Sequence, residues 1–218
     1  MSAEYDVIVI GAGPAGEHCA GHLAEAGLKV AIVEPELIGG ECSYYACIPS
    51  KTLLRPGEAV ADALAAPGAR EAVSGEIGVE QALAWRDFIV SNYDDTAQER
   101  WLAEQGIDLF RGPGRIVAPG TVAVGDIEYE TRHVVLATGS EPVIPPIPGL
   151  RELQGVWTNR EATGLKEVPR RMVVLGAGPA GVELAQAVSR LGASVVLVEA
   201  DVLDPRPSPG RDEQALAS

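Results

Sequence analysis

Aromatic and cysteine residues are scarce in this chain, and long apolar runs are absent. Aromatics make up 5% of the 218 residues, and three cysteines are too few for a small disulfide-rich fold. No apolar run is long enough to span a membrane, and the acidic start lacks the basic and apolar regions of a signal peptide. We therefore expect a cytoplasmic protein with reduced thiols and no membrane partner.

Basic residues are also few. The chain has 17 Lys and Arg against 31 Asp and Glu, which gives a formal net charge of -14. Such a surface repels nucleic acid, so we expect no nucleic-acid partner. Anionic cofactors remain possible, because the backbone amides at a helix N-terminus hold phosphate without any basic side chain.

Two segments of the chain repeat each other. Residues 7–36 and 172–201 align without a gap, and both contain GAGPAG. Each predicts a buried strand, a Gly-rich turn, a helix and a second strand ending in an acid, which is a βαβ unit. The predicted fold class is α/β: a Rossmann-like domain with a β-meander at residues 1–150, and a second, truncated Rossmann-like domain at 151–218.

The rest of the chain gives coarser expectations. Residues 49–66 predict a helix with a break near Pro56, and residues 79–105 predict one long helical segment. Its expected core anchors are Trp85, Phe88, Ile89, Trp101 and Leu102. Short strands are expected at 107–110, 114–117, 121–124, 127–131 and 133–137. The proline-rich residues 142–149 predict a stiff connector, only two strands can be drawn after Pro169, and a disordered tail is expected from about residue 204.

Each Gly-rich turn has the spacing G-x-G-x-x-G. In the first, Gly11 permits a tight turn, Gly13 lets the backbone approach a pyrophosphate, and Gly16 lets the helix pack on the strand. Glu34, at the end of the second strand, can accept the hydroxyls of an adenosine ribose. The second unit repeats this pattern at Gly176, Gly178, Gly181 and Glu199. An acid at Glu199 repels a 2'-phosphate and so favours NAD over NADP.

A pair of cysteines lies in the segment GGECSYYACIPSK, residues 39–51. A regular helix would hold the Cα atoms of Cys42 and Cys47 about 8.6 Å apart, beyond the roughly 7 Å that a disulfide allows. A bridge therefore needs a distorted turn, and it would be easily reduced. A helix start near Pro49 and the charge of Lys51 would favour a thiolate at Cys47.

Other interpretations of the cysteines remain open. The pair could be two ordinary buried thiols, whereas a zinc site would need further ligands that the neighbouring sequence does not offer, so we expect no metal. Cys19 lies alone on the first helix and is expected in the core. The three histidines, His18, His22 and His133, are interpreted as partly solvated helix residues and a strand-edge residue.

The order GAGPAG, GGxCxxxxCxPSK, ATG and again GAGPAG resembles the class I pyridine nucleotide-disulfide oxidoreductases, the group of dihydrolipoamide dehydrogenase, glutathione reductase and mercuric reductase. The resemblance covers about residues 5–199. It implies FAD at the first site and NAD(P)H at the second. The implied FAD-binding residues are Gly11, Gly13, Pro14, Ala15, Gly16, Glu34, Gly39, Gly40, Glu41, Lys51, Gly114, Ala137, Thr138 and Gly139. The implied nicotinamide-cofactor residues are Gly176, Gly178, Gly181 and Glu199.

The same resemblance implies a catalytic set. Cys42 would be the interchange cysteine that faces a small-molecule or protein disulfide substrate, and Cys47 the charge-transfer cysteine against the flavin. Lys51 would lie beside the flavin and pair with Glu183. The chain departs from the common GGTCLNVGC pattern at Glu41, Tyr44 and Ala46, which leaves the substrate open.

Full-length relatives are homodimers whose dimerisation domain carries a His and Glu acid-base pair, and we expect this chain to lack that domain. The first hypothesis is a FAD-dependent NAD(P)H:disulfide oxidoreductase of the dihydrolipoamide dehydrogenase type. A second is a non-catalytic, truncated flavin-binding remnant, because half a nucleotide-binding domain leaves apolar sheet faces uncovered. A third is an enzyme like mercuric reductase, because a thiolate pair also binds soft metals.

Overall fold

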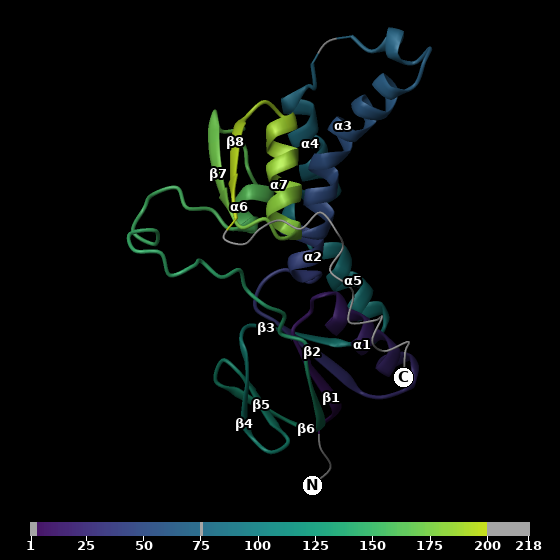
Figure 1. Cartoon of the computed structure of the whole chain (residues 1–218). Helices are drawn as coiled ribbons and strands as arrows, with labels where there is room; N and C mark the ends of the chain where they lie inside the picture. The colour runs from purple at the N-terminus through teal and green to yellow at the C-terminus, as the bar shows by residue number, and fades with distance from the viewer. Residues whose placement is uncertain (1–3, 75, 200–218) are drawn as a thin grey trace, which may run out of the picture.

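The computed structural model describes residues 4–74 and 76–199 (Figure 1). Its larger sheet has six strands in the order β3-β2-β1-β6-β5-β4. The parallel part comprises β1 (Tyr5–Ile10), β2 (Val30–Glu34), β3 (Asp108–Arg111) and the second half of β6 (Ile127–Leu136). The antiparallel meander comprises β4 (Gly114–Ala118), β5 (Thr121–Val124) and the first half of β6. The predicted α/β class with a meander is confirmed.

β6 corrects one expectation, because it is a single strand of ten residues and not two short strands. Its first half pairs with β5, where Glu130 lies opposite Thr121, and its second half pairs with β1, where Thr131 lies opposite Tyr5. The strand changes partner without a turn. The polar residues around Thr131 suggested that one strand ends there and another begins, although no Gly or Pro interrupts the strand.

Both faces of the parallel strands are covered. Helices α1 (Pro14–Glu25) and α5 (Thr96–Glu104) lie on one face, where Ala20 and Leu102 pack against Val9 and Ile32. On the other face, Ile8, Ile10 and Val33 form a cluster with Val122 and Val124 of the meander. This alternation along β1 is the period-two pattern of a strand buried on both sides.

A helical layer joins the two βαβ units, formed by α3 (Cys47–Ala65), α4 (Val79–Ile89) and α7 (Pro179–Arg190) (Figure 1). Contrary to expectation, α3 continues through Pro56 without ending. Leu53 and Leu54 of α3 are buried against α4 and α7, and this packing outweighs the local penalty of a proline. At Gly57 a Cβ would come within 2.5 Å of the Arg190 side chain, so the glycine allows α7 to approach closely.

The expected long helix at 79–105 is wrong, because the chain forms α4, a short 3-10 turn η2 (Ser91–Tyr93) and α5. Ser91, Asn92 and Tyr93 all have positive φ, at 52°, 52° and 61°, which no right-handed helix can accommodate. Ser, Asn and Asp side chains compete with the helix for backbone hydrogen bonds, and this stretch is rich in them.

The buried face of α4 also differs from the prediction. Trp85, Phe88 and Ile89 are 41%, 72% and 40% exposed, so they are not core anchors. Leu102 is fully buried as predicted, and Trp101 packs partly buried against the same cluster. The inward side of α4 carries Ala82, Leu83 and Arg86, and a charged residue at such a position hides the buried face from a hydrophobicity pattern.

The second βαβ unit consists of β7 (Arg171–Leu175), α7 and β8 (Ser194–Val198), and its two strands are parallel. Three short helices complete the described chain: α2 (Gly40–Tyr44), η1 (Arg70–Ala72) and α6 (Asn159–Thr163). Residues 142–149 contain neither helix nor strand. No helix among residues 4–74 and 76–199 is long and apolar enough to cross a membrane. The expected tail from residue 204 lies outside the described residues, and the domain boundary at 150 stays a prediction.

Candidate functional site

The first Gly-rich turn connects β1 to α1, and its three glycines have distinct environments. Gly11 has φ +103°, and a Cβ there would come within 2.2 Å of the Ala137 carbonyl oxygen. A Cβ at Gly16 would lie 1.9 Å from the Gly11 oxygen, so only glycine lets α1 approach the strand. Gly13 faces open space. These are the turn, packing and ligand-approach positions that the sequence assigns.

Residues from three other segments meet at this turn. Ala137, which begins the Ala137-Thr138-Gly139 stretch after β6, donates its N–H to the Ile10 oxygen at 2.8 Å. Gly40 lies against Gly13, whose Cα would be 2.9 Å from a Cβ there. Gly114 of β4 packs on the side chains of Ile10 and Val33. Of the residues predicted for the first site, Gly40, Gly114 and Ala137 therefore lie around this turn, at the carboxyl ends of β1, β2 and β6.

Glu34 closes this site from the end of β2 and is buried. Its Oε2 accepts the N–H of Ala12 at 2.8 Å, and its Oε1 accepts the N–H of Glu36 at 2.8 Å. The carboxylate thereby ties the Gly-rich turn to the end of β2. Each oxygen keeps further acceptor capacity, because an ionised carboxylate has about four lone-pair sites.

The start of α1 suits a phosphate. Its N-cap is Gly13, with no side-chain cap, and Pro14 and Ala15 form its first turn. Pro14 has no N–H, so the N–H groups of Ala15 and Gly16 are the ones that can bind an anion here, and the helix dipole favours negative charge there. The glycine cradle, the open amides and the buried acid together fit an adenine dinucleotide.

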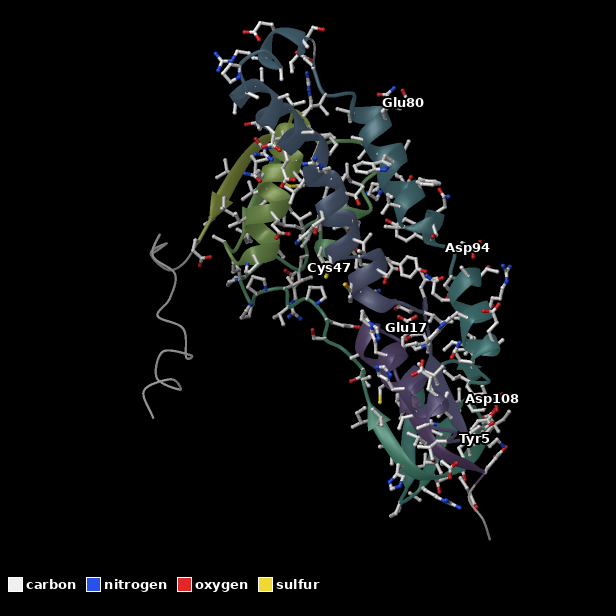
Figure 2. All side chains as sticks on the ribbon, turned by 90° about the vertical axis from the view of Figure 1, so that its right-hand side faces the viewer. Tyr5, Glu17, Cys47, Glu80, Asp94 and Asp108 are labelled. Carbon is white, nitrogen blue, oxygen red and sulfur yellow. The ribbon has the colours of Figure 1, made fainter. Side chains whose placement is uncertain are left out.

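The cysteine segment joins the Gly-rich turn to α3. Cys42 lies in α2 and Cys47 begins α3, and Ala46 between them has φ -132° and ψ -94°, which interrupts the helix. The regular helix is thus broken between the two thiols, and α3 begins two residues before Pro49. Both cysteines are free thiols, with Cys42 partly buried and Cys47 exposed. Figure 2 shows Cys47 between the large sheet and the layer of α3 and α7.

The two thiols interact directly. A hydrogen bond with Cys47, followed by burial, raises the pKa of the Cys42 thiol to about 11, and the charge of Lys51 partly opposes that rise. The sequence placed these three groups in one segment, and the structure brings them together. Cys19 is separate on α1 and is only partly buried.

Lys51 links the cysteine segment to the second unit. Its Nζ donates to Glu183 Oε2 of α7 at 2.5 Å, and Ser50 Oγ lies 3.5 Å from the same oxygen. Ser50 Oγ also donates to the Cys47 carbonyl at 3.3 Å. The first turn of α3 is therefore connected to α7 by a pair that the sequence separates by 132 residues.

The second Gly-rich turn repeats the geometry of the first. Gly176 has φ +101°, Gly178 faces open space, and a Cβ at Gly181 would lie 2.0 Å from the Gly176 oxygen. Glu199 Oε2 accepts the N–H of Ala177 at 2.5 Å, as Glu34 accepts that of Ala12. A hollow of about 650 Å³ lies over β7 and the start of α7.

The sequence analysis missed Asn159, Arg160 and Thr163, which contact the cysteine segment from α6. Glu41, predicted as a cofactor contact, points its carboxylate at α6, where Asn159 and Arg160 donate to its two oxygens. Tyr45 also contacts α6 through its carbonyl. The departure of Glu41 from the family pattern was the one signal in the sequence that this position has a different partner.

Comparison with known proteins gives consistent matches. Residues 5–209 match the family model described as pyridine nucleotide-disulphide oxidoreductase. A dihydrolipoyl dehydrogenase of Acholeplasma laidlawii is 35% identical, over 91% of this chain and 60% of the relative. A mercuric reductase of Staphylococcus aureus is 34% identical, over 90% of this chain and 36% of the relative.

The solved structures agree with these matches. The Cu(II) complex of the HOCl-induced flavoprotein disulfide reductase RclA from Escherichia coli has a TM-score of 0.76 at 30% identity, over 94% of this chain and 44% of that chain. The chain thus spans about 36% to 60% of the length of these proteins. The family is FAD-dependent and uses NAD(P)H. On these matches and on the geometry of its two Gly-rich turns and its cysteine segment, the chain belongs to the pyridine nucleotide-disulphide oxidoreductase family.

Proposed function

We propose that this chain is the flavin-binding and redox-active part of a dihydrolipoyl dehydrogenase-like NAD(P)H:disulfide oxidoreductase. One observation carries the proposal: two adjacent thiols lie in a segment that contacts the first Gly-rich turn through Gly40 and α7 through Lys51. Electrons entering at a nucleotide on the second unit and leaving at a disulfide substrate would pass through this point. Neither Gly-rich turn alone would indicate disulfide chemistry.

The first site would hold FAD. The open amides at the start of α1 suit the pyrophosphate, and Glu34 suits the adenosine ribose. The residues Gly39, Gly40, Gly114 and Ala137-Thr138-Gly139 would line the rest of the cofactor path. When bound, FAD supplies a two-electron relay between the nicotinamide and the cysteine pair.

The cysteines would carry the exchange with substrate. The Cys42 thiol loses its proton and attacks one sulfur of a disulfide, so a mixed disulfide forms and the first substrate thiol leaves with that proton. The Cys47 thiolate then attacks the Cys42 sulfur, which releases the second substrate thiol and leaves the Cys42–Cys47 disulfide. Two electrons and one proton, supplied ultimately by NAD(P)H as a hydride, together with one proton from solvent, return the disulfide to two thiols.

Lys51 and Glu183 would set the electrostatic environment of the two thiols. The ammonium of Lys51 favours the thiolate form of Cys42, and Glu183 holds the Lys51 side chain in place. Glu199, at the end of β8, would disfavour the 2'-phosphate of NADP, so NAD is the proposed nicotinamide cofactor.

The proposed partner is a small-molecule or protein disulfide, and a second copy of the chain is expected in the complete enzyme. Turnover is expected to require polypeptide equivalent to the part of the longer relatives that this chain does not match. We therefore expect the 218-residue chain, loaded with FAD, to oxidise NADH at near-background rates with lipoamide or oxidised glutathione. Sustained turnover at roughly 1 per second or more would contradict this expectation.

The redox role is tested directly on the thiols. In air-equilibrated protein, alkylation followed by mass spectrometry is expected to show Cys42 and Cys47 protected and Cys19 modified. A mild dithiol should expose both protected thiols, because a reactive disulfide is easily reduced. Free alkylation of both cysteines in the air-equilibrated sample would contradict the proposal.

Mercuric ion reduction is the second candidate, supported by the adjacent free thiols and by the mercuric reductase relatives. Two neighbouring thiols are a suitable ligand set for a soft metal ion. Binding of Hg²⁺ by wild-type protein, compared with a Cys42→Ser variant, would show whether the pair holds the ion. Equal binding by both proteins would remove this candidate.

A further inference from the structure

The helix α6 contacts the cysteine segment from more than a hundred residues away in sequence. Asn159 Nδ2 donates to Glu41 Oε2 at 2.9 Å and to the Tyr45 carbonyl at 2.9 Å. Thr163 Oγ1 donates to the same carbonyl at 3.1 Å. Arg160 Nε donates to Glu41 Oε1, so both carboxylate oxygens of Glu41 are bonded to α6.

Arg160 makes the most extensive of these contacts. Besides Glu41, it donates from a second nitrogen to Glu36 Oε2 at 2.8 Å, and its guanidinium lies over the Tyr45 ring, 4.5 Å from the centroid. The Arg160 and Glu41 side chains are only about one-third exposed. Charge-assisted bonds and stacking on an aromatic face are the contacts for which arginine is better suited than lysine.

The residues that α6 contacts lie on both sides of Cys42 and just before Cys47. Glu41 directly precedes Cys42, and Tyr45 lies in the gap between α2 and α3, two residues before Cys47. Because the helix is interrupted in this gap, its backbone has fewer hydrogen bonds of its own to fix the spacing of the two sulfurs. The α6 contacts supply the missing restraint at both sides of Cys42 and just before Cys47.

We infer that Arg160 is a positioning residue that holds the turn between α2 and α3 so that Cys42 and Cys47 stay within reach of disulfide formation. The inference rests on the proposed redox function and adds to it a residue from outside the cysteine segment. It also accounts for the acid at position 41, where the family commonly has threonine: the carboxylate is the anchor for Arg160 and Asn159.

A restraint of this kind acts on the disulfide equilibrium. Two thiols that the fold holds close together have a high effective concentration toward each other, and releasing the turn lowers that concentration. A tenfold fall in the equilibrium constant for forming the Cys42–Cys47 bridge corresponds to a midpoint potential about 30 mV more positive. Arg160→Ala is expected to produce a shift of at least this size. Arg160→Lys keeps the charge but loses the forked geometry, so it should restore only part of the wild-type potential.

The test compares four versions of the full chain: wild type, Arg160→Ala, Arg160→Lys and Arg151→Ala. Arg151 is the matched control, because it lies in the same connecting region and its one hydrogen bond to the described residues goes to the Ile144 carbonyl, away from the cysteines. Each protein is equilibrated in glutathione redox buffers, quenched and alkylated. Cys42 and Cys47 lie in one tryptic peptide, residues 30–51, whose mass reports the oxidised fraction, while Cys19 lies in another.

Hydrogen exchange of amides 40–47 in the reduced proteins provides a readout that needs no disulfide. Exchange at least tenfold faster in Arg160→Ala than in Arg151→Ala supports the restraint. If wild type forms no disulfide in any buffer, the proposed function fails, and the exchange measurement alone decides on the restraint. If wild type forms the bridge and Arg160→Ala has the same potential as Arg151→Ala, the positioning role of Arg160 is overturned while the redox function stands.

Discussion

Replacing Glu34 is the sharpest test of the first nucleotide site. In the folded chain Glu34 is 8% exposed, and its carboxylate already accepts two backbone N–H groups, from Ala12 and Glu36. About two of its four lone-pair sites remain, which is what two ribose hydroxyls require. A hydrogen bond to a charged group contributes about 1.5–3 kcal/mol, and about 1.4 kcal/mol corresponds to a tenfold change in affinity. Loss of even one ribose contact in Glu34→Ala should therefore weaken FAD binding at least tenfold.

Glu34→Ala also destabilises the fold, and the assay must separate this effect from the loss of FAD binding. Without the carboxylate, the N–H groups of Ala12 and Glu36 lose their acceptor, and for the buried N–H of Ala12 this costs about 1–3 kcal/mol. Glu34→Gln is the more conservative variant, because its amide oxygen can keep one of those bonds while the charge is lost. Glu25→Ala is the matched control, since it removes an exposed acid from the end of α1.

Flavin fluorescence titration of the apo proteins gives the dissociation constants, and circular dichroism shows whether each variant is folded. We expect Glu34→Gln to lie between wild type and Glu34→Ala, and Glu25→Ala to match wild type. FAD should also raise the unfolding temperature of wild type more than that of Glu34→Ala, because stabilisation by a ligand follows its affinity. Equal FAD affinity in folded wild type and folded Glu34→Ala would show that the first Gly-rich unit is not the FAD site.

Three further predictions concern titration and stability. Cys47→Ala should move the midpoint of Cys42 alkylation below pH 11, because the hydrogen bond with Cys47 is the main cause of the raised Cys42 pKa; an unchanged midpoint in the pH profile would contradict this. Arg86→Ala should lower the free energy of unfolding by about 3–5 kcal/mol in urea titrations, since the buried guanidinium bonds the carbonyls of Thr163 and Leu165, whereas the exposed Arg132→Ala should cost less than about 1 kcal/mol. Burial, and then the charge of Glu34, raises the pKa of Glu17 to about 7, so the folded state binds more protons and stability should fall as the pH rises from 4.5 to 7; Glu17→Gln should flatten that decline in pH-dependent melting curves.

The Gly-rich units were predictable because their determinants are local. The turn, the helix start and the terminal acid lie within about thirty residues, and Gly16 and Gly181 are required by the close approach of Gly11 and Gly176, five residues earlier in each turn. The pairing of Lys51 with Glu183 crosses 132 residues, so only the family resemblance could suggest it. Arg160 had no such pattern to point to it, because its partners Glu36 and Glu41 lie more than a hundred residues earlier.

The errors in the helical layer have a common physical cause. Hydrophobic periodicity assumes that the apolar side of a helix faces inward, and on α4 that assumption selects Trp85, Phe88 and Ile89. The helix instead buries Arg86, whose Nε pairs with the adjacent Asp87 and whose other two nitrogens donate to the Thr163 and Leu165 carbonyls, far along the chain. A buried charge satisfied by distant backbone leaves no trace in a local pattern. The continuous α3 through Pro56 has the same origin, since tertiary packing decided against local propensity.

A comparison of the two repeats shows which part of the site the shared motif explains and which part it does not. Glu34 and Glu199 occupy equivalent positions and accept equivalent N–H groups, from Ala12 and Ala177, so the repeated sequence produces the repeated geometry. The repeats diverge directly after the last glycine of each turn, and two residues after it α7 carries Glu183 where α1 carries His18. Glu183 binds Lys51 beside the cysteines, whereas His18 is exposed. The difference at this one helical position, and not the shared motif, gives the second unit its ion pair beside the redox pair. Glu183→His should therefore leave both Gly-rich turns intact while it separates Lys51 from α7.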